Sequence, residues 1–213
     1  VRWRHPERGV VPPDDFIPFA EQHGLIGRID SFVLDEACRQ LAEWTSRDGW
    51  PGAFTMAVNV SGAELSDPEF AGRVAEVIDR HGIEPSLLCL EITETALVGD
   101  VQETLSALPK LGVRLALDDF GTGYSTLSHL QRLKVDILKI DRSFVAQIGR
   151  SPHDRDIVAA VMAMSHTLGT TVVGEGIETS NQLDALAGLD CDQGQGFLFA
   201  RPLSPEAVAA LVA

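Results

Sequence analysis

The sequence has few cysteines, few basic side chains and no long apolar run. Its three cysteines among 213 residues are an odd number without Cys-x-x-Cys spacing, which favours reduced thiols over a disulfide framework. Lysine and arginine total 17 against 31 acidic side chains, which gives a net charge of −14. So little positive charge offers no basic surface to polymeric nucleic acid or anionic lipid, so we expect neither as a partner.

No apolar stretch approaches the roughly 20 residues that span a bilayer, and no charged-then-apolar signal opens the chain. We therefore expect a cytoplasmic protein without direct membrane insertion, which an upstream domain could still tether to a membrane. The opening Val1-Arg2-Trp3-Arg4 resembles the end of a strand, so we expect a piece of a longer protein. The apolar content of 45% indicates a globular chain, and we expect one domain over residues 1–213.

Short apolar, often β-branched runs alternate with amphipathic helical patterns along the chain. In one such helix, Asp100 with Glu103 predicts a capping-box start and Gly112 predicts the end. The expected strands are 54–60, 87–93, 114–120, 136–141, 171–177 and 196–199. The expected helices are 31–44, 66–81, 100–111, 154–168, 180–186 and one that starts at Ser204. The strand runs are nearly continuously apolar, as in strands buried on both faces, so the pattern predicts an α/β fold with a parallel sheet or barrel.

Polar residues follow nearly every one of these apolar runs at its C-terminal side. The C-terminal ends of barrel strands share one face with the loops that follow them, so we expect these polar groups to converge at one active site. A single charged residue at a strand end often marks only where the chain leaves the core, but six strands that share the pattern favour a site. The residues are Asn59, Glu91, Asp118, Asp119, Lys139, Asp141 and Glu175 at the ends of their runs, and Gln195 at the start of the last strand.

Several carboxylates that converge in this way raise one another's pKa unless a cation compensates their charge. Oxygen ligands without histidine or cysteine favour Mg²⁺ or Mn²⁺ over Zn²⁺. The adjacent Asp118 and Asp119 would let one carboxylate bridge two ions, an arrangement that supports in-line displacement at phosphorus. Lys139 is expected to orient the water or the phosphate, and a purely structural salt bridge is its alternative role.

Seven segments of the chain, in matching order and spacing, resemble the EAL-domain family of cyclic di-GMP phosphodiesterases. The Asp-Phe-Gly among them does not indicate a kinase, because the chain has no His-Arg-Asp motif and no kinase-type Gly-rich loop. The segments are Val1-Arg2-Trp3-Arg4-His5-Pro6, Val58-Asn59-Val60-Ser61, Leu90-Glu91-Ile92-Thr93-Glu94, Asp118-Asp119-Phe120-Gly121-Thr122-Gly123-Tyr124-Ser125, Leu138-Lys139-Ile140-Asp141-Arg142, Gly174-Glu175-Gly176-Ile177-Glu178 and Gln195-Gly196-Phe197.

The resemblance implies a modified (β/α)₈ barrel of the TIM type, here without the family's first strand and most of its second. It also implies hydrolysis of cyclic di-GMP to linear pGpG with two Mg²⁺ or Mn²⁺ ions. By the same resemblance, Asn59 and Glu91 are ligands of the first ion. Asp118 bridges the two ions, and Asp119 with Glu175 are ligands of the second.

The resemblance further assigns residues to catalysis and to substrate binding. Lys139 holds the attacking water and, with Asp119 and Glu175, makes up the catalytic set. Gln195 lies beside that water, and Arg2 contacts a phosphate. Phe197 is expected to line the pocket for a guanine base.

Glu94 resembles the glutamate that hydrogen-bonds the loop 121–128, which keeps the two adjacent aspartates oriented. That loop is rich in Gly, Thr and Ser, and by resemblance the region after Asp119 forms a homodimer surface. Asp141 and Glu178 belong to matching motifs, but no individual role follows for either.

The chain departs from the family at one metal ligand. The family is named for a Glu-Ala-Leu that precedes the Val-Arg-Trp with which this chain opens, and its Glu binds the first ion. We expect a truncated version of a complete domain, with a natural remnant as the alternative. The leading functional hypothesis is a metal-dependent phosphodiesterase. A non-hydrolytic cyclic di-GMP receptor or scaffold is the second hypothesis, and a barrel hydrolase acting on other phosphate esters is the third.

Overall fold

The computed structural model describes residues 1–47, 50, 54–97, 99–121, 133–148 and 152–212. The expected loop 121–128 and the dimer surface after Asp119 therefore lie almost wholly outside the described residues.

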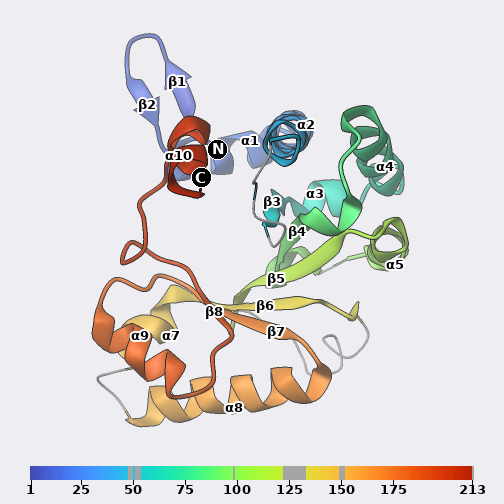
Figure 1. Ribbon diagram of the computed structural model, residues 1–213. Helices are drawn as coiled ribbons and strands as arrows, with labels where there is room; N and C mark the ends of the chain where they lie inside the picture. Colours follow the sequence, from blue (N-terminus) through green and yellow to red (C-terminus); the bar gives the residue numbers. More distant parts are fainter. Residues whose placement is uncertain (48–49, 51–53, 98, 122–132, 149–151, 213) are drawn as a thin grey trace.

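A six-stranded parallel sheet forms the centre of the structure (Figure 1). Each strand pairs with the next along the chain, in the spatial order β3-β4-β5-β6-β7-β8. This order without reversal is the connectivity of a barrel wall, in which each crossover returns on the same side. The predicted α/β class is confirmed. The strands are β3 (Met56–Val60), β4 (Leu88–Thr93), β5 (Arg114–Phe120), β6 (Ile137–Ile140), β7 (Thr171–Gly174) and β8 (Gln193–Gly194).

Two buried clusters pack the helices against this sheet. One joins β3, β4 and the first part of β5 to α2 and α4, around side chains such as Leu41, Val74 and Leu90. The other joins β6 and β7 to α8 and α9, around Leu138 and Leu186. The helices are α1 (Ile17–Gln22), α2 (Ile26–Thr45), α3 (Gly62–Leu65), α4 (Phe70–His81), α5 (Gln102–Ala107), α7 (Arg142–Gln147), α8 (Pro152–Leu168), α9 (Ser180–Ala187) and α10 (Pro205–Val212). No described helix is both long and apolar enough to cross a bilayer.

The N-terminal segment stands apart from the central sheet. Strands β1 (Trp3–His5) and β2 (Gly9–Val11) form an antiparallel hairpin, which leads into the 3₁₀ turn η1 (Pro13–Asp15). In Figure 1 the hairpin projects above the sheet, and the last helix, α10, lies near the N-terminus.

The expected strand at 196–199 is wrong. The last strand ends at Gly194, and the following residues form hydrogen-bonded turns in which Phe199 and Ala200 donate their N–H groups to the Gly196 carbonyl. Gly196 explains the turn, because a Cβ there would lie 2.1 Å from the Ile177 carbonyl oxygen, and only glycine permits so close a crossing of two backbones.

Two helix expectations also change. The N-cap of α5 is Val101 and its side chain accepts no hydrogen bond, so the capping box predicted from Asp100 and Glu103 is absent at this described terminus. The helix then tightens into a 3₁₀ turn, η4 (Leu108–Leu111), before Gly112 ends it with a φ of 87° as predicted. The helix expected at 66–81 is interrupted before α4 begins at Phe70.

Candidate active site

The predicted polar residues lie at the C-terminal ends of neighbouring strands. Asn59 on β3 is the direct register partner of Glu91 on β4, and its Nδ2 donates to Glu91 Oε2 at 3.2 Å. Asp118 and Asp119 end β5, and Lys139 lies in β6. Glu175 directly follows β7, and Gln195 directly follows β8.

Lys139 is the centre of this arrangement. Its ammonium Nζ lies 2.7 Å from Glu175 Oε1, 2.8 Å from Glu91 Oε1 and 3.2 Å from Asp118 Oδ1. The residue is only 4% exposed. Burial by itself lowers the pKa of Lys139, but the charges of these three carboxylates outweigh burial and raise that pKa above its ordinary value. The lysine therefore stays charged and holds the ends of three different strands together.

A bulge at the end of β5 brings two consecutive carboxylates to the same site. Side chains alternate between the faces of a regular strand, so Asp118 and Asp119 would normally point in opposite directions. Here the register with β6 shifts between Leu117 and Phe120, and Asp119 has a φ of 54°. Aspartate tolerates this left-handed conformation better than most residues. One oxygen each of Asp118, Asp119 and Glu175 consequently lie within 4.8 Å of one another.

Two of these carboxyl groups, Asp119 and Glu175, have raised pKa values, so their ionised forms are disfavoured. Burial raises the pKa of Asp119, and the neighbouring charge of Asp118 raises it further. Burial also raises the pKa of Glu175, against the lowering effect of Lys139. Glu91, Asp118 and Glu175 surround the ammonium, and Asp119 adds a fourth carboxyl group next to Asp118 and Glu175. A hard cation fits such a set of oxygen donors, so the group formed by Asp118, Asp119 and Glu175 could bind a metal.

Glu94 lies where the resemblance places it, at the start of the 3₁₀ turn after β4. It is 5% exposed, and its Oε2 accepts the backbone N–H of Gly121 at 3.3 Å. Gly121 has a φ of 101°, and a Cβ there would lie 2.6 Å from the Phe144 ring. The hydrogen bond thus holds the backbone two residues beyond the bulge.

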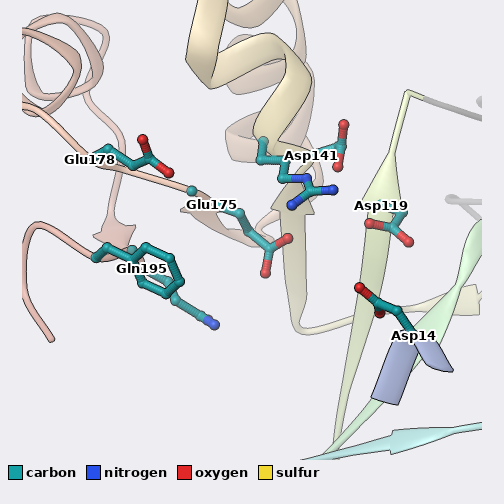
Figure 2. A pocket seen from close by; sticks show the side chains of 10 residues that line it. Asp14, Asp119, Asp141, Glu175, Glu178 and Gln195 are labelled. Carbon is teal, nitrogen blue, oxygen red and sulfur yellow. The ribbon is translucent and has the colours of Figure 1, made fainter. Parts of the chain in front are cut away.

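A cavity of about 590 Å³ opens beside the carboxylates (Figure 2). In that view Glu178 and Gln195 lie on one side, Asp119 and Asp14 on the other, and Glu175 between them. The residues that line the cavity are Asp14, Asp119, Asp141, Arg142, Glu175, Gly176, Glu178, Gln195, Gly196 and Phe197. The structure therefore brings Gln195 and Phe197 together with the carboxylates, as expected.

Arg2 and Asn59 line a second cavity, of about 720 Å³, between β3 and the helices α1 and α2. The described guanidinium of Arg2 is exposed and donates to the Val1 carbonyl oxygen at 2.7 Å. Asp14 lines both cavities, so the two adjoin at this residue.

Sequence reasoning missed two charged residues of the first cavity. Asp14 belongs to η1, an irregular segment whose position over the sheet has no periodic signal in the sequence. Arg142 begins α7 directly after Asp141, and its positive charge partly offsets the raised pKa of Asp119. Arg142 could have been predicted as a site residue from its position directly after Asp141, in the same segment as Lys139.

The fold and the site define a barrel-type α/β domain with an acidic centre that is suited to a hard metal ion. The model of the EAL domain family matches residues 1–202. The chain belongs to this family, and the resemblance drawn from its motifs is confirmed.

The relatives include enzymes of cyclic di-GMP metabolism. The chain is 42% identical over 216 residues to the bifunctional diguanylate cyclase/cyclic di-GMP phosphodiesterase MucR of Pseudomonas aeruginosa, a match that covers 100% of the chain and 31% of MucR. It is 42% identical over 206 residues to the cyclic di-GMP phosphodiesterase NbdA of the same species, across 95% of the chain and 26% of NbdA. The chain thus spans less than a third of either protein.

A solved structure of the PaMucR phosphodiesterase in its c-di-GMP complex has the same fold. The TM-score is 0.90 at 41% identity, and the match covers 97% of this chain and 84% of that one. This agreement supports the barrel-type architecture predicted from the sequence.

Proposed function

We propose that the chain hydrolyses one phosphodiester bond of cyclic di-GMP and releases linear pGpG. The observation that carries this proposal is the centre formed by Lys139 and the carboxylates of Glu91, Asp118 and Glu175. It lies at the C-terminal strand ends, where barrel enzymes build their active sites. The relatives named for cyclic di-GMP hydrolysis support the choice of substrate.

Two groups of oxygen donors would hold two Mg²⁺ or Mn²⁺ ions. Asn59, Glu91 and Asp118 would hold the first, and Asp118, Asp119 and Glu175 the second, with Asp118 shared. The ions, when bound, would polarise the phosphoryl oxygens and lower the pKa of the attacking water. The short oxygen separations among the second group support its assignment.

The chain's own side chains would orient the reactants. Lys139, buried and with its pKa raised by the surrounding carboxylates, would donate to the attacking water, with Gln195 beside it. Arg2 would contact a phosphate, and Phe197 would face a guanine base. Water adds to phosphorus, the bond from phosphorus to the ribose 3′ oxygen breaks, and that oxygen takes up, overall, the proton that the water gives up. The product then carries a 5′ phosphate.

We also propose a single EAL-type domain over residues 1–213, a homodimer through the region after Asp119, and a cytoplasmic location. The family match over residues 1–202 supports the first. The free thiols of Cys38, Cys89 and Cys191 support the last, because reduced cysteines are typical of the cytosol.

The test is the release of pGpG from cyclic di-GMP with Mn²⁺ or Mg²⁺, quantified by chromatography. It is run on this chain and on a form preceded by the family's Glu-Ala-Leu strand. The expected result is that pGpG is released and that Glu175→Gln abolishes this release. Binding of cyclic di-GMP without any pGpG from either form would favour the receptor hypothesis over the enzyme.

A further inference from the structure

The segment after β8 forms one wall of the first cavity, and its backbone is held at two points. The Ile177 N–H donates to the Gln195 carbonyl at 3.0 Å, and the Leu198 N–H donates to the Ile177 carbonyl at 2.9 Å. Gly196 lies between these bonds, where it has room for no side chain. The backbone of Phe197 is therefore fixed against the strand-end segment that also carries Glu175 and Glu178.

The side chain of Phe197 is not fixed by burial. It is 53% exposed, although it lines the cavity together with Gln195. An exposed aromatic side chain can populate several χ1 rotamers, and only some of them would present the ring to the cavity. Some other contact must select the rotamer if the ring is to act as a fixed surface.

Arg201 supplies such a contact. Its guanidinium carbon lies 4.8 Å from the centre of the Phe197 ring and over its face, within the range of a cation–π interaction. Among the described residues, Arg201 forms no ion pair with a carboxylate, and it is not part of the cavity lining. The guanidinium thus covers a face of the Phe197 ring without itself lining the cavity.

We propose that Arg201 is a positioning residue that holds the Phe197 ring as a platform on which a guanine base of the substrate stacks. The inference rests on the proposed function for its ligand. Ordering the ring before the base arrives reduces the conformational entropy that binding must otherwise remove. Arg201 acts through Phe197 and does not touch the reacting atoms, so it affects substrate binding and not the chemical step.

The test is a double-mutant cycle on pGpG release by the full chain. Arg201→Ala should raise KM about two- to five-fold, the size of an exposed cation–π contact, and leave kcat within about two-fold. Arg201→Lys should restore most of the loss, because an ammonium also binds a ring face. In the Phe197→Ala background, Arg201→Ala should have no further effect. Arg28→Ala, another exposed arginine outside both cavities, is the control and should match wild type.

A second measurement needs no substrate. Side-chain NMR of Phe197 in the ligand-free protein should show one dominant χ1 rotamer in wild type and averaging in Arg201→Ala. An equally ordered ring in the variant, or an equal effect of Arg201→Ala with and without Phe197, would overturn the positioning role. A wild-type protein that neither binds nor hydrolyses cyclic di-GMP would instead overturn the proposed function, and the substrate part of this inference with it.

Discussion

Carboxylates stand at both edges of the six-stranded sheet, but the two edges hold them in opposite ways. At the N-terminal edge, Asp136 Oδ2 accepts the Leu115 N–H at 2.8 Å, and Asp192 Oδ2 accepts the Val172 N–H at 2.8 Å. Each of these aspartates precedes one strand and binds the first residues of a neighbouring strand. At the C-terminal edge, by contrast, Glu91, Asp118 and Glu175 converge on a single ammonium.

The difference separates residues that support the fold from residues that support the site. An aspartate that accepts a strand N–H satisfies a backbone donor that would otherwise be unpaired. Around Lys139, Asp118 Oδ1 accepts the N–H of the adjacent Asp119 at 3.0 Å, but the three carboxylates converge on the ammonium and repel one another, an arrangement that becomes favourable when cations bind. Barrel enzymes in general divide stability and catalysis between these two faces. The variants below test that division.

The largest expected effect is on turnover, through Lys139→Met. The variant keeps the length of the side chain but removes the ammonium that would orient water, so we expect pGpG release to fall at least about 100-fold. Lys110→Met, on the exposed turn η4, is the matched control and should retain full activity. Near-normal turnover in Lys139→Met would leave Lys139 with a purely structural role.

The next expected effect is on metal binding, through Asp118→Asn. Saturating Mn²⁺ should stabilise the wild-type protein by about 2.7 kcal/mol at 100 times the Kd, and EDTA should reverse the gain. Asp118→Asn removes a charged oxygen that the two proposed donor groups would share, so most of this gain should vanish in thermal unfolding. Asp192→Asn, at the opposite edge, should keep the full Mn²⁺ response. Equal responses of the two variants would contradict the division between the edges.

The positions of the site residues along the chain could be predicted because the end of a strand has a recognisable sequence pattern. An apolar run followed by a polar residue located Glu91 and Glu175, and β5 has the bounds that were predicted. The same pattern extended β7 three residues too far, to Ile177, because an apolar residue beyond a strand gives the same signal as one within it.

The three-dimensional details could not be predicted in the same way. The bulge that turns Asp119 toward Asp118 depends on one backbone angle of 54°, which no hydrophobic pattern encodes. The approach of Gly196 to Ile177 joins residues 19 apart in sequence, so a local strand propensity at 196–199 gave the wrong element. Asp14 reaches the cavity from an irregular segment, whose placement depends on the whole fold.

A smaller effect is expected at the N-terminal edge, through Asp136→Ala. The change leaves the N–H of the buried Leu115 without its carboxylate acceptor, so the free energy of unfolding should fall by about 1–3 kcal/mol in urea denaturation. The Mn²⁺ response should persist, since no donor oxygen at the C-terminal edge is altered. Asp79→Ala, at the exposed end of α4, is the control and should change stability by less than about 0.5 kcal/mol. An Asp136→Ala protein with normal stability and no Mn²⁺ response would reverse the roles of the edges.

The smallest effect is expected for a carboxylate at neither edge, through Asp35→Asn. Asp35 Oδ1 on α2 lies 3.0 Å from His81 Nε2 and 2.7 Å from Arg80 Nη1 on α4, and the hydrogen bond with His81, followed by that with Arg80, lowers the pKa of this carboxyl. Because the folded pKa lies below the unfolded one, the ionised group stabilises the fold above the unfolded value of about 4, and this contribution disappears as pH falls through the folded value.

The side chains of Asp35 and Arg80 are largely exposed, so solvent screens their charges. We therefore expect Asp35→Asn to lower the free energy of unfolding by less than about 1 kcal/mol at pH 7. Unfolding of both proteins in urea should give curves that converge as the pH falls below 4 and as salt approaches about 1 M, where screening acts over roughly 3 Å. A difference that grows on acidification would show that the variant acts through packing between α2 and α4. In that case Asp35 would hold α2 and α4 together by packing and not by charge. It would then no longer serve as a charged reference for the carboxylates around Lys139.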